Sequence, residues 1–261
     1  MSDEDRVSVT DKVLALLGAF SHEEPALTLT ELSQRTGLSL PTVHRRVGEL
    51  VEWGALERGR DRRYRVGLRL WEVATLAPRG HGIRDVALPV LQDLYDVSKQ
   101  QHIHLSVRNH TDVVILERLS APNAPQAVGR TGGRFGTFAT GAGLVLLAHA
   151  PFDVREEYLS NPLARYTEET VTDPGRLRSI LAAVRRDGHS NSDRMMAADV
   201  HCVGAPIYGP DDTVVAAVSI CFRAGTQSFR AVAPSVRAAA RKISGTLRAE
   251  SANATTRPMT E

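Results

Sequence analysis

The sequence predicts a mixed α+β protein with two domains, an N-terminal winged helix-turn-helix domain that ends in a linker helix and a C-terminal α/β domain. Three observations predict this fold class. Two short helical segments are joined by a glycine turn between residues 28 and 54, a basic hairpin follows them, and strand-like runs mix with amphipathic helices from residue 83 onward. A chain of 261 residues is long enough to form a core in each domain.

The helix pair is marked by its end signals. Thr28 and Glu31 have the spacing of a capping box, and Gly37, which can adopt positive φ, ends the first helix. Ser39 then stands at the N-cap of the second helix, whose first turn tolerates Pro41. The second helix has one apolar face with helical spacing, formed by Val43, Val47, Leu50 and Val51.

The opposite face of the second helix is polar and basic. It carries Thr42, His44, Arg45, Arg46 and Glu49. Arginine can bind the O6 and N7 atoms of guanine, or a phosphate, so this face is typical of a helix that reads the major groove. The alternative is that one of the two arginines only pairs with Glu49 on the same helix face.

A basic hairpin is expected directly after the helix pair, with strands at 56–58 and 64–66 and a turn at 59–61. From residue 35 to residue 69 there are nine arginines and four acids, whereas the net charge of the whole chain is only +2. This concentration of charge predicts contact with phosphate or the minor groove. The residues expected to contact DNA are Ser39, Pro41, Thr42, His44, Arg45, Arg46, Arg60, Arg62 and Arg63.

Further elements follow from periodicity and turn residues. Helices are expected at 7–19, 67–77, 83–100, 140–149, 153–158, 174–187 and 234–248, and strands at 102–107, 112–119, 127–129, 200–207 and 214–222. The Pro- and Gly-containing stretch 78–82 is expected to interrupt the chain near the domain boundary. The polar stretch 250–261 is expected to be a disordered tail.

Three sequence blocks carry a family resemblance. They are LTELSQRTGLSLPTVHRRVGELVEWGALER with the YRVGLRLWEVA that follows, AVGRTGGRFGTFATGAGLVLLA, and HCVGAPIYGPDDTVVAAVSI. From about residue 9 to about residue 245 the chain resembles the IclR-type bacterial transcriptional regulators. The resemblance implies a dimerising winged helix-turn-helix domain with its linker helix at 1–80, and a GAF-like effector-binding domain at 81–249.

The resemblance also implies a pocket for a small-molecule effector. Carried over residue by residue, its lining is Gly141, Ala142, Ser192, Asp193, Cys202, Ser219 and Cys221. The start of a helix at Gly141 offers free N–H groups to a carboxylate, and Ser219 can donate a further hydrogen bond. The alternative is that both cysteines are small buried hydrophobes.

Three departures from the family pattern suggest that the ligand differs from a small keto acid. Ser192 stands where an acidic residue often reaches the effector. Asp199 replaces a common glycine, and Leu144 replaces the usual lysine after Gly143.

Composition excludes several other classes. No apolar run approaches the roughly 20 residues that span a bilayer, and the acidic N-terminus has no signal core, so a cytoplasmic protein that associates with the nucleoid when bound to DNA is expected. Two cysteines without a C-x-x-C pattern indicate neither a disulfide framework nor a zinc knuckle. His102, His104 and His201 are better explained as core or surface histidines than as a metal site, and no cofactor is expected.

The leading hypothesis is a transcription factor, with repression as the expected direction, whose C-terminal domain binds a small carboxylic acid and modulates binding to a palindromic DNA operator. It is expected to act as a homodimer or a dimer of dimers. One alternative is an enzyme with an accessory DNA-binding module, against which stands the absence of G-x-S-x-G, Walker, H-E-x-x-H and dinucleotide-binding motifs. Another is an architectural DNA-binding protein without a ligand.

Overall fold

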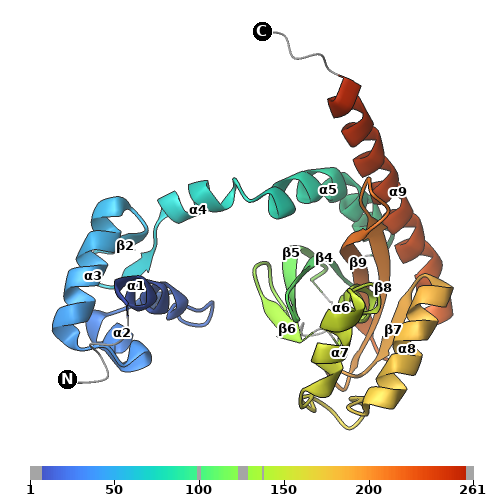
Figure 1. Ribbon diagram of the computed structural model, residues 1–261, viewed down its shortest axis with the longest axis horizontal. Coiled ribbons are helices and arrows are strands. Elements are labelled where there is room, and N and C mark those ends of the chain that lie inside the picture. The colour runs from blue at the N-terminus through green and yellow to red at the C-terminus, as the bar shows by residue number, and fades with distance from the viewer. Residues whose placement is uncertain (1–7, 99–100, 123–128, 137, 257–261) are drawn as a thin grey trace. The chain divides into compact units, whose positions relative to one another are not determined.

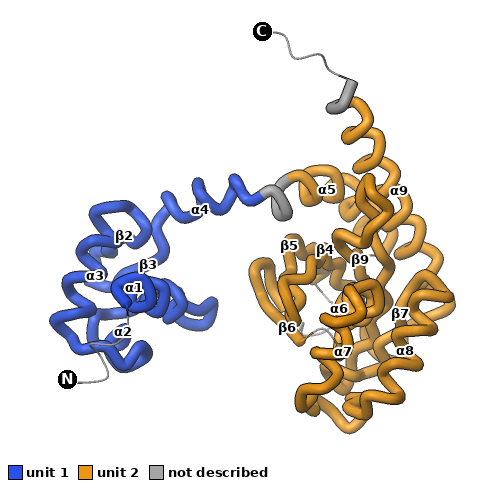
Figure 2. Tube along the Cα trace, in the orientation of Figure 1, with its two compact units in different colours: residues 1–81 blue, residues 82–261 orange. Residues whose placement is uncertain are grey.

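The computed structural model describes residues 8–98, 101–122, 129–136 and 138–256 (Figure 1). The chain forms two compact units, residues 1–81 and residues 82–261 (Figure 2). Within the described residues, no helix is both long and apolar enough to cross a membrane.

The first unit is a helix-turn-helix followed by a small antiparallel sheet. Its helices are α1 (Val9–Gly18), α2 (Leu29–Thr36), α3 (Leu40–Trp53) and α4 (Leu68–Ala74), and its strands are β1 (Ala26–Leu27), β2 (Leu56–Arg58) and β3 (Tyr64–Val66), in the order β1-β3-β2. The capping box at Thr28 and Glu31 is formed, and α2 and α3 end at Gly37 (φ 71°) and Gly54 (φ 86°) in the left-handed region. Strands β2 and β3 pair antiparallel, which confirms the predicted hairpin. Strand β1 adds a third strand that was not expected.

One apolar cluster holds this unit together. The buried face of α3, with Val43, Val47 and Leu50, packs with Leu16 of α1 and Leu32 of α2. Burying a side chain of this size contributes about 1.5–3 kcal/mol. The opposite face of α3 is consequently left to solvent.

The second unit is built on a six-stranded antiparallel sheet in the order β6-β5-β4-β9-β8-β7. Its strands are β4 (His102–Asn109), β5 (Asp112–Ser120), β6 (Arg134–Gly136), β7 (Ser190–Asp193), β8 (Val200–Tyr208) and β9 (Val214–Arg223). Its helices are α5 (Pro78–Ser98), α6 (Gly141–Ala148), α7 (Phe152–Ser160), α8 (Pro174–Asp187) and α9 (Phe229–Thr256). This is the mixed α/β architecture that was predicted.

The two faces of the sheet pack against different helices. Ile103 and Leu105 of β4 belong to the core formed with α5 and α9. Because side chains alternate along a strand, His102, His104 and Ser106 point to the other face, where α6, α7 and α8 form a second core (Figure 1). Buried polar side chains on that second face position the candidate site.

Several sequence predictions about element ends are wrong. Helix α5 already begins at Pro78, because proline is tolerated in a first turn, so 78–82 does not interrupt the chain. Helix α9 begins at Phe229, contains Pro234 and continues to Thr256, so residues 250–256 are helical and not a disordered tail. Of the strand expected at 127–129, residues 127 and 128 lie outside the described residues and Gly129 is not in a strand. The short polar strand β7 was missed.

Candidate DNA-binding face and effector cavity

The exposed face of α3 contains one unengaged arginine. Arg45 is exposed and, among the described residues, forms neither a hydrogen bond nor an ion pair. Arg46 instead donates from Nη1 to both carboxylate oxygens of Glu49, at 2.7 and 2.8 Å, and its side chain is only 12% exposed. The alternative of pairing with Glu49 therefore holds for Arg46 but not for Arg45.

The first turn of α3 presents small polar groups beside Arg45. Ser39 occupies the N-cap position, and its Oγ lies 2.9 Å from the Oγ1 of Thr42. Pro41 and His44 are exposed on the same helix. These side chains lie where a recognition helix contacts base edges and phosphates.

The arginines of the β2–β3 hairpin divide into engaged and free groups. Arg63 donates from Nη1 to Ala26 O at 2.9 Å and to the Glu31 carboxylate at 3.0 Å, so it fastens the hairpin to the capping box of α2. Arg60 and Arg62 at the turn are exposed, and neither forms an ion pair within the described part of the chain. Arg60 and Arg62 are therefore available to phosphate, as is Arg58 of β2, which is exposed and lies 5.7 Å over the Tyr64 ring.

Two acids of the wing region are held ionised by these contacts. Hydrogen bonds from the backbone of Thr28, and more weakly from Arg63, lower the pKa of Glu31. The hydrogen bond from Arg65 lowers the pKa of Asp61 to about 2. Arg65 is thus held in an ion pair with Asp61.

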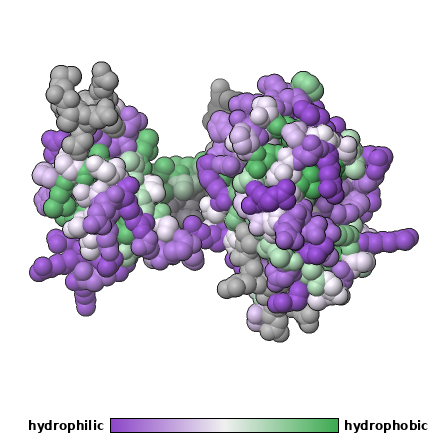
Figure 3. Space-filling model, turned by 90° about the horizontal axis from the view of Figure 1, so that it is seen from below, coloured by the Kyte–Doolittle hydropathy of each residue, from purple (hydrophilic) through white to green (hydrophobic). Residues whose placement is uncertain are grey.

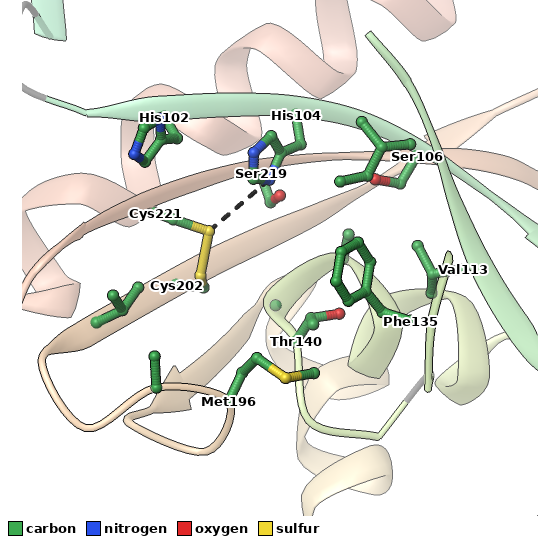
Figure 4. A pocket seen from close by; sticks show the side chains of 15 residues that line it. His102, His104, Ser106, Val113, Phe135, Thr140, Met196, Cys202, Ser219 and Cys221 are labelled. Carbon is green, nitrogen blue, oxygen red and sulfur yellow. Dashed lines mark hydrogen bonds between the residues drawn. A yellow bond between two sulfur atoms is a disulfide. The ribbon is translucent and has the colours of Figure 1, made fainter. Parts of the chain in front are cut away.

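In the second unit a cavity lies between the start of α6 and the polar face of the sheet (Figure 4). Its volume, counted as space open to the centres of water molecules, is about 40 Å³. One water needs roughly 10–15 Å³ by this measure, so the cavity holds about three waters and must widen to admit a larger ligand. The lining residues are His102, His104, Ser106, Val113, Ile115, Phe135, Thr140, Gly141, Ala142, Met196, Ala197, Val200, Cys202, Ser219 and Cys221.

Two glycines allow α6 to begin directly on the sheet. A Cβ at Gly204 would lie 2.5 Å from the carbonyl oxygen of Gly141, and a Cβ at Gly141 would lie 3.1 Å from the Cβ of Cys202. Ser190 fixes the contact, because its Oγ donates to Gly141 O at 2.6 Å and accepts from Gly204 N at 3.2 Å. Thr140 caps the helix by accepting from Gly143 N. The amides of residues 141 and 142 thus stand at the cavity as the unsatisfied donors of a helix N-terminus.

The structure brings together five of the seven predicted effector residues, namely Gly141, Ala142, Cys202, Ser219 and Cys221. Ser192 and Asp193 do not line the cavity. The buried Ser192 donates to Ala139 O at 2.9 Å and so positions the loop before α6. Asp193 is 53% exposed and pairs with Arg194 and His201, both at 3.0 Å.

The two cysteines are not independent buried thiols. Cys202 of β8 and Cys221 of β9 are register partners and form a disulfide, with Cα atoms 4.2 Å apart. The prediction that no disulfide is indicated is therefore wrong, because it relied on sequence spacing, whereas the β8–β9 hairpin places the two positions opposite each other.

Two histidines, His102 and His104, line the cavity, and sequence reasoning had given them no role. Burial, followed by the nearby His102 and Arg118, lowers the pKa of His104 to about 3, so its imidazole is neutral at physiological pH. His201 lies elsewhere and stacks on Phe229, with ring centroids 4.7 Å apart. The described residues contain no group of three or more side chains suited to a metal ion.

Other lining residues were missed as well. Ser106, Phe135, Thr140 and Met196 come from four separate segments, and only strand alternation from His102 could have indicated Ser106. The Oγ atoms of Ser106 and Ser219 make no hydrogen bond within the described residues. The cavity therefore offers an apolar middle with several free polar groups around it.

One chain thus combines a winged helix-turn-helix unit that has unpaired cations with an α/β unit that contains a cavity. This combination defines a transcription factor of the kind that carries its own sensor domain. Comparison with known proteins places the chain in one family. Residues 9–60 match the IclR helix-turn-helix domain, and residues 76–245 match the bacterial transcriptional regulator IclR C-terminal domain. The protein belongs to the IclR family of transcriptional regulators.

Individual relatives agree with this assignment. The chain is 29% identical to the HTH-type transcriptional regulator KipR of Bacillus subtilis, over 80% of this chain and 83% of that protein. It is 28% identical to KdgR of Escherichia coli, over 92% of each. An IclR homolog from Microbacterium hydrocarbonoxydans, solved in complex with 4-hydroxybenzoate, superposes with a TM-score of 0.89 at 36% identity and covers 93% of this chain and 100% of its own.

Proposed function

We propose that this IclR-family regulator is a repressor that binds a palindromic operator as a homodimer and responds to a small carboxylic acid in the α6 cavity. The observation that carries the proposal is the cavity itself, where the free amides of a helix N-terminus and the unbonded Ser219 hydroxyl meet beside an apolar middle. Donors of this kind bind carboxylates. As a regulator, the protein would act in the cytoplasm, on the nucleoid.

The proposed DNA binding is supported by the exposed face of α3. Arg45 can bind a guanine edge or a phosphate without first breaking an ion pair, and Arg60 and Arg62 can contact flanking phosphates. A homodimer would place two such helices in successive major grooves, which requires an operator with matching two-fold symmetry.

Exposed apolar side chains support dimer formation through the first unit. Leu68, Trp71 and Leu76, which lie on α4 or just after it, are 63%, 62% and 79% exposed, and Leu14 of α1 is 58% exposed. Hydrophobic patches interrupt the hydrophilic surface of this unit in Figure 3. Exposed apolar surface of this kind marks an interaction site, and a second copy of the chain is the partner that a palindromic operator demands.

An aromatic acid is a reasonable first ligand. The Microbacterium hydrocarbonoxydans homolog was crystallised with 4-hydroxybenzoate, and the cavity lining combines Phe135, Met196 and Ile115 with the polar groups around them. Such a ligand is larger than about three waters, so binding would have to widen the cavity. A ligand that changes the protein in this way can alter DNA affinity only through its different affinity for the two states.

The test begins with genomic footprinting to find the operator, followed by operator binding measured by fluorescence anisotropy. We expect Arg45→Ala to weaken operator binding by about 1–3 kcal/mol, or roughly 5- to 150-fold. Arg46→Ala, which breaks the pair with Glu49, should weaken it less. Equal affinities of wild type and Arg45→Ala for the operator would contradict the assignment of the DNA-binding face.

The proposed response to an effector is tested with a panel of aromatic and aliphatic acids that includes 4-hydroxybenzoate. An effector should raise the melting temperature, remain chemically unchanged, and shift operator affinity by a coupling of about 1–3 kcal/mol. Turnover of the acid would instead favour an enzyme with a DNA-binding module. Operator binding that ignores every acid in the panel would favour an architectural protein.

A further inference from the structure

A β-bulge turns an arginine toward the cavity side of the sheet. In the β4–β5 pair, Ser106 is opposite Ile115 while Leu105 is opposite Glu117, so Leu116 is the extra residue. Ile115 and Arg118 are three positions apart and would point to opposite faces in a regular strand. The bulge places both on the face of the sheet that bears the cavity, and bulges often re-aim a side chain next to a functional site.

The guanidinium of Arg118 has no counterion in the described part of the chain. Its Nη1 donates to the carbonyl oxygen of Gly129 and its Nη2 lies 3.4 Å from His102 Nδ1, while its Nε is buried without a hydrogen-bond partner. The neighbouring carboxylate of Glu117 is occupied by Arg84 at 2.6 Å. Residues 123–128, which follow this strand, include no acid in the sequence.

A second orphaned atom lies beside Arg118. His104 is the register partner of Arg118 on β4, and its Nε2 is buried without a partner among the described residues. Its Nδ1 faces the sulfur of Cys221 at 3.9 Å (Figure 4). Most buried polar atoms have a hydrogen-bond partner, so two unsatisfied nitrogens on paired residues indicate that something else bonds to them.

His104 lines the cavity, and Arg118 is its neighbour on β5, one strand further from α6. A single row crosses the sheet from Arg118 through His104 and Ser219 to Gly204, on which α6 begins. Neighbouring strands are about 4.8 Å apart, so the ends of this row are separated by roughly 14 Å between backbones.

We propose that Arg118 and His104 form a second polar anchor of the effector cavity, which binds an oxygen acceptor at the end of the effector opposite its carboxylate. This inference rests on the proposed function, because it takes the first anchor to be the α6 N-terminus with Ser219. A hydroxyl group suits the second anchor, since it can accept from the guanidinium and donate to an imidazole nitrogen that lacks a proton.

The test compares two ligands of nearly equal shape on the full-length protein. Isothermal titration calorimetry would measure the affinity of 4-hydroxybenzoate and of 4-methylbenzoate, in which a methyl group replaces the hydroxyl. We expect wild type to prefer the hydroxyl compound by about tenfold or more, as for a hydrogen bond to a charged group. Arg118→Met should lose most of this preference and keep its affinity for 4-methylbenzoate within about twofold of wild type.

Matched variants separate this anchor from the first one. Ser219→Val should weaken both ligands equally, because it removes a donor at the carboxylate end. Arg118→Lys, which keeps the charge, should retain part of the preference for the hydroxyl compound. If Arg118→Met does not unfold in a cooperative thermal transition, Arg118→Lys is used in its place.

The outcomes also distinguish this inference from the proposed function. If wild type binds both acids with equal affinity, or if the Arg118 variants keep the full preference, the second anchor is wrong while the effector cavity stands. If wild type binds neither of these acids nor any other carboxylate, the carboxylate assignment fails, and the second anchor fails with it.

Discussion

A single added methyl group at Gly204 should separate the sensing function from DNA binding. The Cβ of Gly204→Ala would lie 2.5 Å from Gly141 O, whereas ordinary contacts of a Cβ begin at 3.4 Å. The start of α6 or the strand beneath it would therefore have to move by about 0.9 Å, the difference between these two distances. The two nearest atoms, the carbonyl oxygen and carbonyl carbon of Gly141, belong to backbone that Ser190 holds in place. The strain therefore cannot be relieved by moving a flexible side chain.

The expected cost follows from this overlap. Overpacking of a well-packed region costs about 1–3 kcal/mol, which corresponds to a decrease of about 2–12 °C in melting temperature for a unit of this size. Because the amides of residues 141 and 142 move with α6, effector affinity should fall by at least about tenfold, since displacements near 1 Å spoil hydrogen-bond geometry. Operator affinity without effector should stay near the wild-type value, because α3 lies in the other compact unit.

Gly245→Ala is the matched control. Gly245 is an exposed helical glycine of α9, and apart from its own helix backbone no atom of the described residues lies within 4 Å of the position that an alanine Cβ would occupy, so alanine should stabilise the unit by about 0.5–1 kcal/mol. Differential scanning fluorimetry and operator anisotropy, each with and without effector, measure the melting temperature, the effector affinity and the operator affinity. A Gly204→Ala protein with the melting temperature and effector response of wild type would refute the claim that α6 is seated on the sheet through this glycine.

Three further changes test other contacts. Arg63→Ala should destabilise the first unit by about 1 kcal/mol in thermal denaturation, because it loses the bonds to Ala26 O and Glu31. Arg60→Ala should leave stability unchanged and lower the salt slope of DNA binding by about one unit. Loss of stability in Arg60→Ala but not in Arg63→Ala would contradict the division of the wing arginines. Unfolded His104 binds a proton below pH 6.5 but the native residue does not until about pH 3, so the wild-type free energy of unfolding should decrease as the pH falls through this window. In urea titrations at several pH values, His104→Gln should reduce this pH dependence by up to about 1.4 kcal/mol per pH unit. Equal pH dependence of the two proteins would exclude a buried neutral histidine. Cys202→Ser should lower the free energy of unfolding of the oxidised protein by about 3 kcal/mol, and a reductant that has no effect on wild-type stability would argue against the disulfide.

Features encoded by neighbouring residues could be predicted from the sequence. The capping box at Thr28, the αL glycines at the ends of α2 and α3, and α8 between Asp173 and Gly188 each depend on a few consecutive residues. The β8–β9 hairpin was predicted for the same reason, since its turn residues separate two apolar runs. The family resemblance then indicated five of the residues that line the cavity.

Features encoded by distant residues could not be predicted in this way. Strand β1 has only two residues and exists because it pairs with β3, almost forty positions later. Strand β7 reads as a polar loop, because its buried side chains are Ser190 and Ser192, and they are buried in order to bond the segment that leads into α6. Neither strand carries the apolar alternation that predicts a strand.

The residues that most affect the ligand hypothesis are those that depart from regular structure. A strand of unbroken register would turn Arg118 away from the cavity, and a serine or alanine at Gly204 would hold α6 away from the sheet. Local rules are broken in natural proteins mainly where function or strain requires it. Here Arg118, which the bulge re-aims, and Gly204 lie at the two ends of one row of paired residues, with unsatisfied nitrogens at one end and the amides of the α6 N-terminus at the other. Packing explains the glycine but leaves the nitrogens of Arg118 and His104 unsatisfied, whereas a ligand hydroxyl, which can both accept and donate, would satisfy them.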